Sequence, residues 1–276
     1  MNILIVDDDA SAREALAQAL IPLCASDAMR QADSADAALT ALAEGFLADL
    51  VVCDVRMPNT NGIELLDVLR QDVRYSAMPV MMITASPDQT VVRQAMQLRV
   101  QGFILKPASA DAERRARAAL ERFHTVLAED AHQVCKRLPC TLRQYESALD
   151  TQLNKLALLI RRLQHWSAGE TLEDVPHGAS ASAVLAQDLA PCVIGARLLG
   201  LPPLLKTLQS LERLVRQDFD ADDDRYTALA QALALQRQWL SSYRGWHHHA
   251  TAQEQRAAAP SVAAGTPNPL IRIPPG

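Results

Sequence analysis

Aromatic residues are scarce in this chain, as are long apolar runs and concentrated basic charge. Only 4% of the 276 residues are Phe, Trp or Tyr, so a helical core must be built mostly from Leu, Ala and Val. No apolar stretch approaches the roughly 18 residues that a membrane span needs, and no signal peptide precedes the first apolar run. These absences predict a soluble, cytoplasmic protein. The net charge of −5 and the lack of a basic recognition helix argue against nucleic acid as a partner and against a transcription factor.

Cysteines are few and irregularly spaced. The five residues are Cys24, Cys53, Cys135, Cys140 and Cys192. They form neither a zinc signature nor a regular disulfide framework, which favours a reducing compartment. No glycine-rich ATP-binding motif is present either, so autophosphorylation from ATP is not expected.

Four short apolar runs in the first half of the chain each end at a polar residue. They are Ile3–Val6 before Asp7, Leu50–Cys53 before Asp54, Val80–Ile83 before Thr84, and Phe103–Leu105 before Lys106. Helical periodicity separates the runs, and a weaker strand is predicted near residues 28–31, giving five strands and five helices in about 120 residues. Because parallel strands end at one edge of a sheet, these carboxylates, the hydroxyl and the ammonium are expected to share one crevice. Such a set of groups is suited to phosphoryl transfer.

These residues, in this order and spacing, resemble the receiver domain of two-component response regulators. The resemblance covers Met1 to about Phe123. It rests on Asp7 and Asp8, Asp54 with Met57-Pro58 and Asn61-Gly62 after it, Thr84-Ala85, and Phe103 three residues before Lys106-Pro107. The family spacing is 30 residues from Asp54 to Thr84 and 22 from Thr84 to Lys106. The resemblance implies a flavodoxin-like, five-stranded parallel sheet of order 2-1-3-4-5.

The resemblance also implies the chemistry of the crevice. Asp54 is expected to accept a phosphoryl group from a cognate histidine kinase or another phosphodonor, without enzymatic activity beyond its own phosphorylation and dephosphorylation. Mg²⁺, or Mn²⁺ in its place, would be held by Asp8, Asp54 and the backbone carbonyl of Arg56, with Asp7 acting through water. Clustered carboxylates repel one another unless a cation joins them or one takes up a proton, and hard oxygen ligands suit these ions.

Three further residues of the resemblance concern the response to phosphorylation. Lys106 and Thr84 are expected to bind the phosphoryl oxygens, and Phe103 to turn inward when Thr84 moves. Phe103 has no hydroxyl where tyrosine is common, and Ala108 stands where a bulky residue is frequent. A switch at this position must therefore act through ring packing.

The second half of the chain has an almost continuous helical pattern. At about 150 residues per domain, the length predicts two domains. We expect the first at residues 1–123, an all-α four-helix bundle at 124–246, and a disordered tail at 247–276, which contains His247–His249 and a short apolar segment, Leu270–Ile273. The apolar seam suits either a bundle within one chain or a coiled coil with a second chain, so a homodimer is compatible with both.

Within the bundle, one segment resembles the histidine phosphotransfer (HPt) domain. It comprises Gly195–Leu201, Leu204-Leu205 and Leu211-Glu212. The phosphorylated histidine of that family lies four residues before the glycine, and Pro191 occupies the position here. The resemblance therefore implies a degenerate phosphotransfer fold that binds protein partners without carrying a phosphoryl group.

Two function classes remain open from the sequence. The first is an adaptor in which phosphorylation of Asp54 controls partner binding or self-association of the bundle. The second is a phosphorelay or phosphatase element in which another histidine, His132 or His177, takes part in phosphotransfer. His165 is a further histidine of the helical half. His132 is more typical of a solvated helix surface, and His177 lies in a predicted Gly- and Pro-containing loop.

Overall fold

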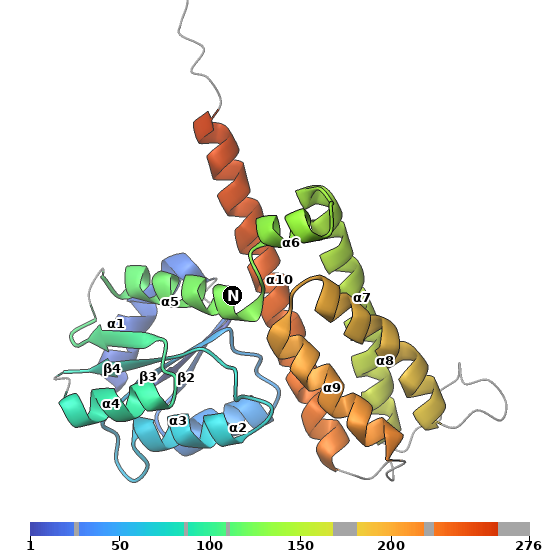
Figure 1. Ribbon diagram of the computed structural model, residues 1–276. Coiled ribbons are helices and arrows are strands. Elements are labelled where there is room, and N and C mark those ends of the chain that lie inside the picture. Colours follow the sequence, from blue (N-terminus) through green and yellow to red (C-terminus); the bar gives the residue numbers. More distant parts are fainter. Residues whose placement is uncertain (25–27, 86–87, 109–110, 168–180, 218–223, 259–276) are drawn as a thin grey trace, which may run out of the picture.

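The computed structural model describes residues 1–24, 28–85, 88–108, 111–167, 181–217 and 224–258. Its first part is an α/β layer structure and its second part is helical (Figure 1). The strands are β1 (Ile3–Val6), β2 (Met29–Ala32), β3 (Leu50–Asp54), β4 (Val80–Thr84) and β5 (Gly102–Leu105). They pair in parallel in the order β2-β1-β3-β4-β5, which confirms the expected topology, including the weak second strand.

Helices cover both faces of the sheet. In chain order they are α1 (Ala10–Leu20) with the short 3-10 helix η1 (Ile21–Leu23), α2 (Ala35–Ala43), α3 (Gly62–Gln71), α4 (Gln89–Gln97) and α5 (Asp111–Leu127). Side chains alternate along each central strand: Leu4 and Val51 face the core under α2, α3 and α4, whereas Ile5 and Val52 face α1 and α5. Because both faces are buried, the strands are continuously apolar, which is why the sequence shows them as short unbroken runs.

The second part consists of α6 (Ala131–Arg137), α7 (Leu142–Ser167), α8 (Ala181–Leu198), α9 (Pro202–Arg216) and α10 (Asp224–Ala258). The last four form a bundle in which α7 and α9 each pack against both α8 and α10. The almost unbroken helical pattern predicted from residue 110 is interrupted, because α5 ends at Leu127 and α6 starts at Ala131. There the side chain of Asp130 caps α6, accepting from the backbone N–H of Gln133 at 3.0 Å.

The C-terminal helix extends further than the sequence suggested. α10 continues to Ala258, past residue 247, where the sequence analysis placed the start of a disordered tail. Residues 259–276, with the apolar segment Leu270–Ile273, lie outside the described residues, and so do the predicted loop at 169–178 and its His177.

α10 also joins the two parts of the molecule and lies beside the α/β part in Figure 1. The indole N–H of Trp239 donates to the carbonyl of Ala48 at 3.0 Å, and the ring of Phe123 on α5 meets the Trp239 ring edge-on at a centroid distance of 5.3 Å. Ser242 donates to the buried carboxylate of Asp49 at 2.9 Å. Ala48 and Asp49 directly precede β3, so these two hydrogen bonds lie at the opposite end of that strand from Asp54.

Candidate functional site

The polar residues predicted to share one crevice do come from neighbouring strand ends. Asp7 follows β1, Asp54 ends β3, Thr84 ends β4 and Lys106 follows β5. The strand register sets Val6 beside Cys53, Asp54 beside Ile83 and Thr84 beside Leu105, so all four ends reach the same edge. The backbone N–H of Lys106 also donates to the carbonyl of Thr84 at 2.9 Å, which fixes the start of the loop after β5.

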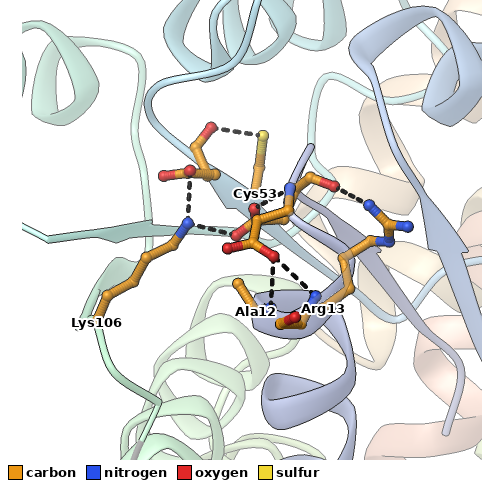
Figure 2. Close-up of polar contacts among 8 residues, drawn as sticks. Ala12, Arg13, Cys53 and Lys106 are labelled. Atoms are coloured by element: carbon orange, nitrogen blue, oxygen red, sulfur yellow. Dashed lines mark hydrogen bonds and ion pairs between the residues drawn. The ribbon is translucent and has the colours of Figure 1, made fainter.

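One ammonium and three carboxylates meet at this edge. Nζ of Lys106 is 2.6 Å from Oδ2 of Asp54 and 2.6 Å from Oδ2 of Asp7 (Figure 2). One oxygen each of Asp7, Asp8 and Asp54 lies within 4.8 Å of the others. Three negative charges and one positive charge leave the cluster with a net negative charge when all four groups are ionised.

Burial makes that excess charge costly. Asp7 is 1% exposed and Asp54 6%, whereas Asp8 is open to solvent. Desolvation raises the pKa of the Asp7 carboxyl, and the nearby Lys106 ammonium only partly offsets it. For Lys106, burial opposes the charge, but the close contacts with Asp54 and Asp7 outweigh it and raise the pKa of the ammonium. The surroundings thus favour the charged form of Lys106 and disfavour the charged form of Asp7.

A divalent cation fits this donor set. Oδ2 of Asp7 is buried and lies 2.6 Å from Nζ of Lys106, an ammonium that it shares with Asp54. Buried carboxylate oxygens that share one positive charge, with a third carboxylate beside them, are a place for a hard cation such as Mg²⁺. Asp7, Asp8 and Asp54 are the residues that could hold it, and the exposed side of Asp8 leaves room for water ligands.

Two features that support the site are not evident from the motif alone. Asp9 caps α1 by accepting from the backbone N–H groups of Ser11 at 2.8 Å and Ala12 at 3.4 Å. Arg13 reaches back to donate to the carbonyl of Asp7 at 2.6 Å, as Figure 2 shows. An Asp directly before a helical segment is an N-cap signal in the sequence, and it could have predicted the cap at Asp9.

Gly62 is needed because it passes close to the backbone of Asp54. A Cβ built on Gly62 would lie 2.1 Å from the carbonyl oxygen of Asp54 and 3.0 Å from Sγ of Cys53. The backbone N–H of Gly62 donates to the carbonyl of Val55 at 3.0 Å, which draws the start of α3 under the loop after β3. The Asn61-Gly62 pair of the sequence motif thus has a packing reason: Asn61 caps α3 and Gly62 leaves room for Asp54.

The other predicted residues lie near the edge in different states of exposure. Thr84 is buried. Arg56 lies in the loop after β3 with an exposed side chain. Phe103 is half-buried and packs against the core on β5. Cys53 is a buried core residue whose thiol pKa is raised by desolvation, as expected for a structural cysteine.

The predicted histidine alternatives lie far along the chain from this edge. His132 is exposed on α6 and His165 is exposed at the end of α7. Pro191, at the position of the HPt histidine, is exposed within α8. Gly195 packs against α7, because a Cβ there would lie 2.0 Å from Oε1 of Gln152, a buried residue of that helix. Gln152 donates to the carbonyl of Cys192 at 2.8 Å, so Gly195 serves the packing of α7 against α8.

The strand ends of this 2-1-3-4-5 sheet bring together a buried aspartate, a lysine paired with it and two further carboxylates. Such a site defines a phosphoacceptor class of domain.

Residues 3–117 match the family model of the response regulator receiver domain. The chain is 36% identical over 110 residues to the chemotaxis protein CheY of Pseudomonas aeruginosa, covering 40% of this chain and 87% of that protein. It is 38% identical over 110 residues to the chemotaxis protein CheY-3 of Vibrio cholerae, and the match covers 40% of this chain and 83% of that protein.

Among solved structures, the receiver domain of NtrX from Brucella abortus is 30% identical, with 44% of this chain and 98% of that chain covered and a TM-score of 0.39. The chain belongs to the response regulator receiver family through its N-terminal part. Receiver domains are phosphoacceptors rather than enzymes in the usual sense, bind Mg²⁺ through acidic residues, and interact with histidine kinases or other phosphodonors. None of the helices in the described part of the chain has both the length and the apolar character needed to cross a bilayer.

Proposed function

We propose that the protein is a two-component response regulator in which Asp54 accepts the phosphoryl group and the helical bundle is the output domain. The single observation that carries the acceptor assignment is the position of Asp54. Asp54 is the last residue of β3, the middle strand of the sheet, whereas Asp7 and Asp8 follow β1; its buried carboxylate lies 2.6 Å from Nζ of Lys106 and is grouped with those of Asp7 and Asp8.

The residues at the edge divide the work of phosphoryl transfer. An oxygen of Asp54 attacks phosphorus; the new O–P bond forms as the bond to the donor, a phosphohistidine nitrogen or the oxygen of an acyl phosphate, breaks. Bound Mg²⁺, or Mn²⁺, would draw charge from the phosphoryl oxygens. Asp8, Asp54 and the carbonyl of Arg56 would hold it directly, and Asp7 through water. The ammonium of Lys106, which pairs with Asp54 and Asp7 before phosphorylation, would then bind a phosphoryl oxygen.

Thr84 and Phe103 are proposed to pass the change on. The phosphoryl group adds a charge of about −1.5 to −2, which attracts the Thr84 hydroxyl as a hydrogen-bond donor. Movement of Thr84 leaves space next to β5, and the half-buried ring of Phe103 fills it. The change is therefore proposed to reach the surface around α4, β5 and α5 through packing.

The domain borders we propose are 1–123 for the receiver, 124–246 for the bundle and 247–276 for the tail, whose residues 247–258 continue α10. The bundle is proposed to be HPt-like in fold, but to bind a protein partner or a second copy instead of carrying phosphate. The exposed face of α8 supports this, because Ile194 is 58% exposed and Leu198 45%, next to Pro191. Exposed apolar side chains on one helix face are typical of an interaction surface.

Labelling the full-length protein with a labelled acyl phosphate and Mg²⁺ tests the acceptor. We expect Asp54→Asn to abolish Mg²⁺-dependent labelling, because an amide cannot form the acyl phosphate. Asp67→Asn is the matched control, since Asp67 lies on α3, bonded only to Gln71 in the described structure, and should label normally. Retained labelling of Asp54→Asn would overturn the assignment. Label on His132 or elsewhere in the bundle would favour a phosphorelay element instead.

Sizing of the protein with and without beryllofluoride, a mimic of the phosphoryl group, tests the output. We expect the apparent mass to change in the wild type and not in Asp54→Asn. An unchanged mass would exclude self-association and leave partner binding as the output.

A further inference from the structure

Two free thiols lie side by side at the corner where α6 leads into α7. Sγ of Cys135 and Sγ of Cys140 are 3.7 Å apart. The backbone N–H of Cys140 donates to the carbonyl of Cys135 at 3.2 Å, so the two backbones are held together as well. Both side chains are partly exposed, so a small reagent can reach the pair.

This pair differs in its surroundings from the buried cysteines. Cys53 and Cys192 are in the core, where desolvation raises the pKa of both thiols, that of Cys192 to about 11. A thiol without access to solvent does not exchange with disulfides. Desolvation also raises the pKa of Cys135, so the pair is set apart by its access to solvent and by the 3.7 Å separation of its two sulfurs. Cys24 is partly exposed, like the pair.

The corner that carries the pair also connects the receiver to the bundle. The backbone N–H of Glu129 donates to the carbonyl of Gly200 at 2.8 Å, and Nη2 of Arg137 donates to the carbonyl of Leu198 at 3.2 Å. The segment from α5 to α7 is thus attached to the turn between α8 and α9. A covalent bond between Cys135 and Cys140 would fasten α6 to the loop residue that lies two positions before the start of α7.

We propose that Cys135 and Cys140 are a modification site at which a low-molecular-weight disulfide, such as oxidised glutathione, forms a reversible bond within the chain. One cysteine thiolate attacks a sulfur of the small disulfide and expels one small thiolate. The second cysteine thiolate attacks the mixed disulfide and expels the other. The cysteine pair loses two electrons and two protons, and the small disulfide becomes two thiols. The sulfurs must approach to about 2.05 Å, a movement of roughly 1.7 Å from their separation of 3.7 Å.

Trypsin provides a direct test because Lys136 and Arg137 lie between the two cysteines. Full-length protein is equilibrated in glutathione buffers of increasing oxidised fraction, quenched in acid, alkylated after unfolding and digested. We expect the peptides 123–136 and 138–143 to be joined in oxidised samples and separate after reduction. The number of alkylated cysteines should fall from five to three in a monomeric chain.

Variants keep the result interpretable. Cys135→Ser and Cys140→Ser should each lose the joined peptides and carry one glutathione on the remaining cysteine. Cys24→Ser should still form them, and far-UV circular dichroism should confirm that all variants fold. The proposal would be overturned if both cysteines stayed alkylated at every glutathione ratio, or if the wild type carried two separate glutathione adducts. It would also be overturned if the peptides were joined between two chains, or only after unfolding. The outcome is independent of Asp54 chemistry.

Discussion

Replacing Trp239 by phenylalanine should weaken the attachment of the bundle to the receiver. Trp239 is 2% exposed, and its indole N–H donates to the carbonyl of Ala48, itself fully buried, at 3.0 Å. Phenylalanine keeps an aromatic ring beside Phe123 but removes the donor, so the Ala48 carbonyl loses its partner in the core. Leaving a buried acceptor unsatisfied costs about 1 to 3 kcal/mol.

The larger truncation Trp239→Ala should cost about 3 to 5 kcal/mol, because most of a buried aromatic side chain is lost. Since the contact joins residues on α10 to the start of β3 and to α5, its loss removes coupling between the two parts of the molecule. We expect the alanine variant to unfold in two separate steps, with the phenylalanine variant showing a lower midpoint.

Urea unfolding followed by far-UV circular dichroism measures both effects without depending on tryptophan fluorescence. Trp166→Phe is the matched control, because the Trp166 ring packs against Tyr226 within the bundle at a centroid distance of 4.8 Å. It should change stability without separating the transitions. A free energy of unfolding for Trp239→Phe within about 0.3 kcal/mol of the wild type would refute the assigned role of the hydrogen bond.

Three further changes probe the receiver. Gly62→Ala places a methyl group 2.1 Å from the carbonyl oxygen of Asp54, so we expect a loss of about 1 to 3 kcal/mol in urea unfolding and weaker beryllofluoride binding. Gly102→Ala, whose Cβ would lie 3.5 Å from Met81, should keep that binding and would count against the argument if it did not. Lys106→Met should tighten Mg²⁺ binding by roughly tenfold, because the positive ammonium repels the cation at a cost of about 1 to 4 kcal/mol. The same change should weaken the binding of beryllofluoride. Titration calorimetry measures both affinities, and a fall in both would indicate misfolding instead. Desolvation raises the pKa of Asp49, more than its hydrogen bonds from Asn2 and Ser242 lower it, so protonation of this carboxyl as the pH falls favours the folded chain. The wild type should therefore gain stability relative to Asp49→Asn as the pH falls from neutral towards about 4, and parallel pH profiles would contradict this.

The contrast between Gly62 and Gly195 shows where sequence reasoning reached its limit. Both glycines were noted as parts of family motifs, and both prove to be sites of close packing, Gly62 against Asp54 and Gly195 against Gln152. For Gly62 the close packing agrees with the Asn61-Gly62 motif, whereas nothing in the segment around Gly195 predicted a contact with α7. Which side of a helix a small residue faces depends on neighbours distant in the chain, and local spacing does not carry that information.

The sequence by itself determined the receiver half. Buried parallel strands must be apolar along their whole length, and their polar ends must meet at one edge, so Asp7, Asp54, Thr84 and Lys106 could be placed together from chain order alone. The docking of Trp239 on Ala48, the break before α6 and the pairing of Cys135 with Cys140 needed the tertiary structure. Each depends on packing between surfaces whose apolar patterns fit several arrangements equally well, and only the folded chain selects one of them.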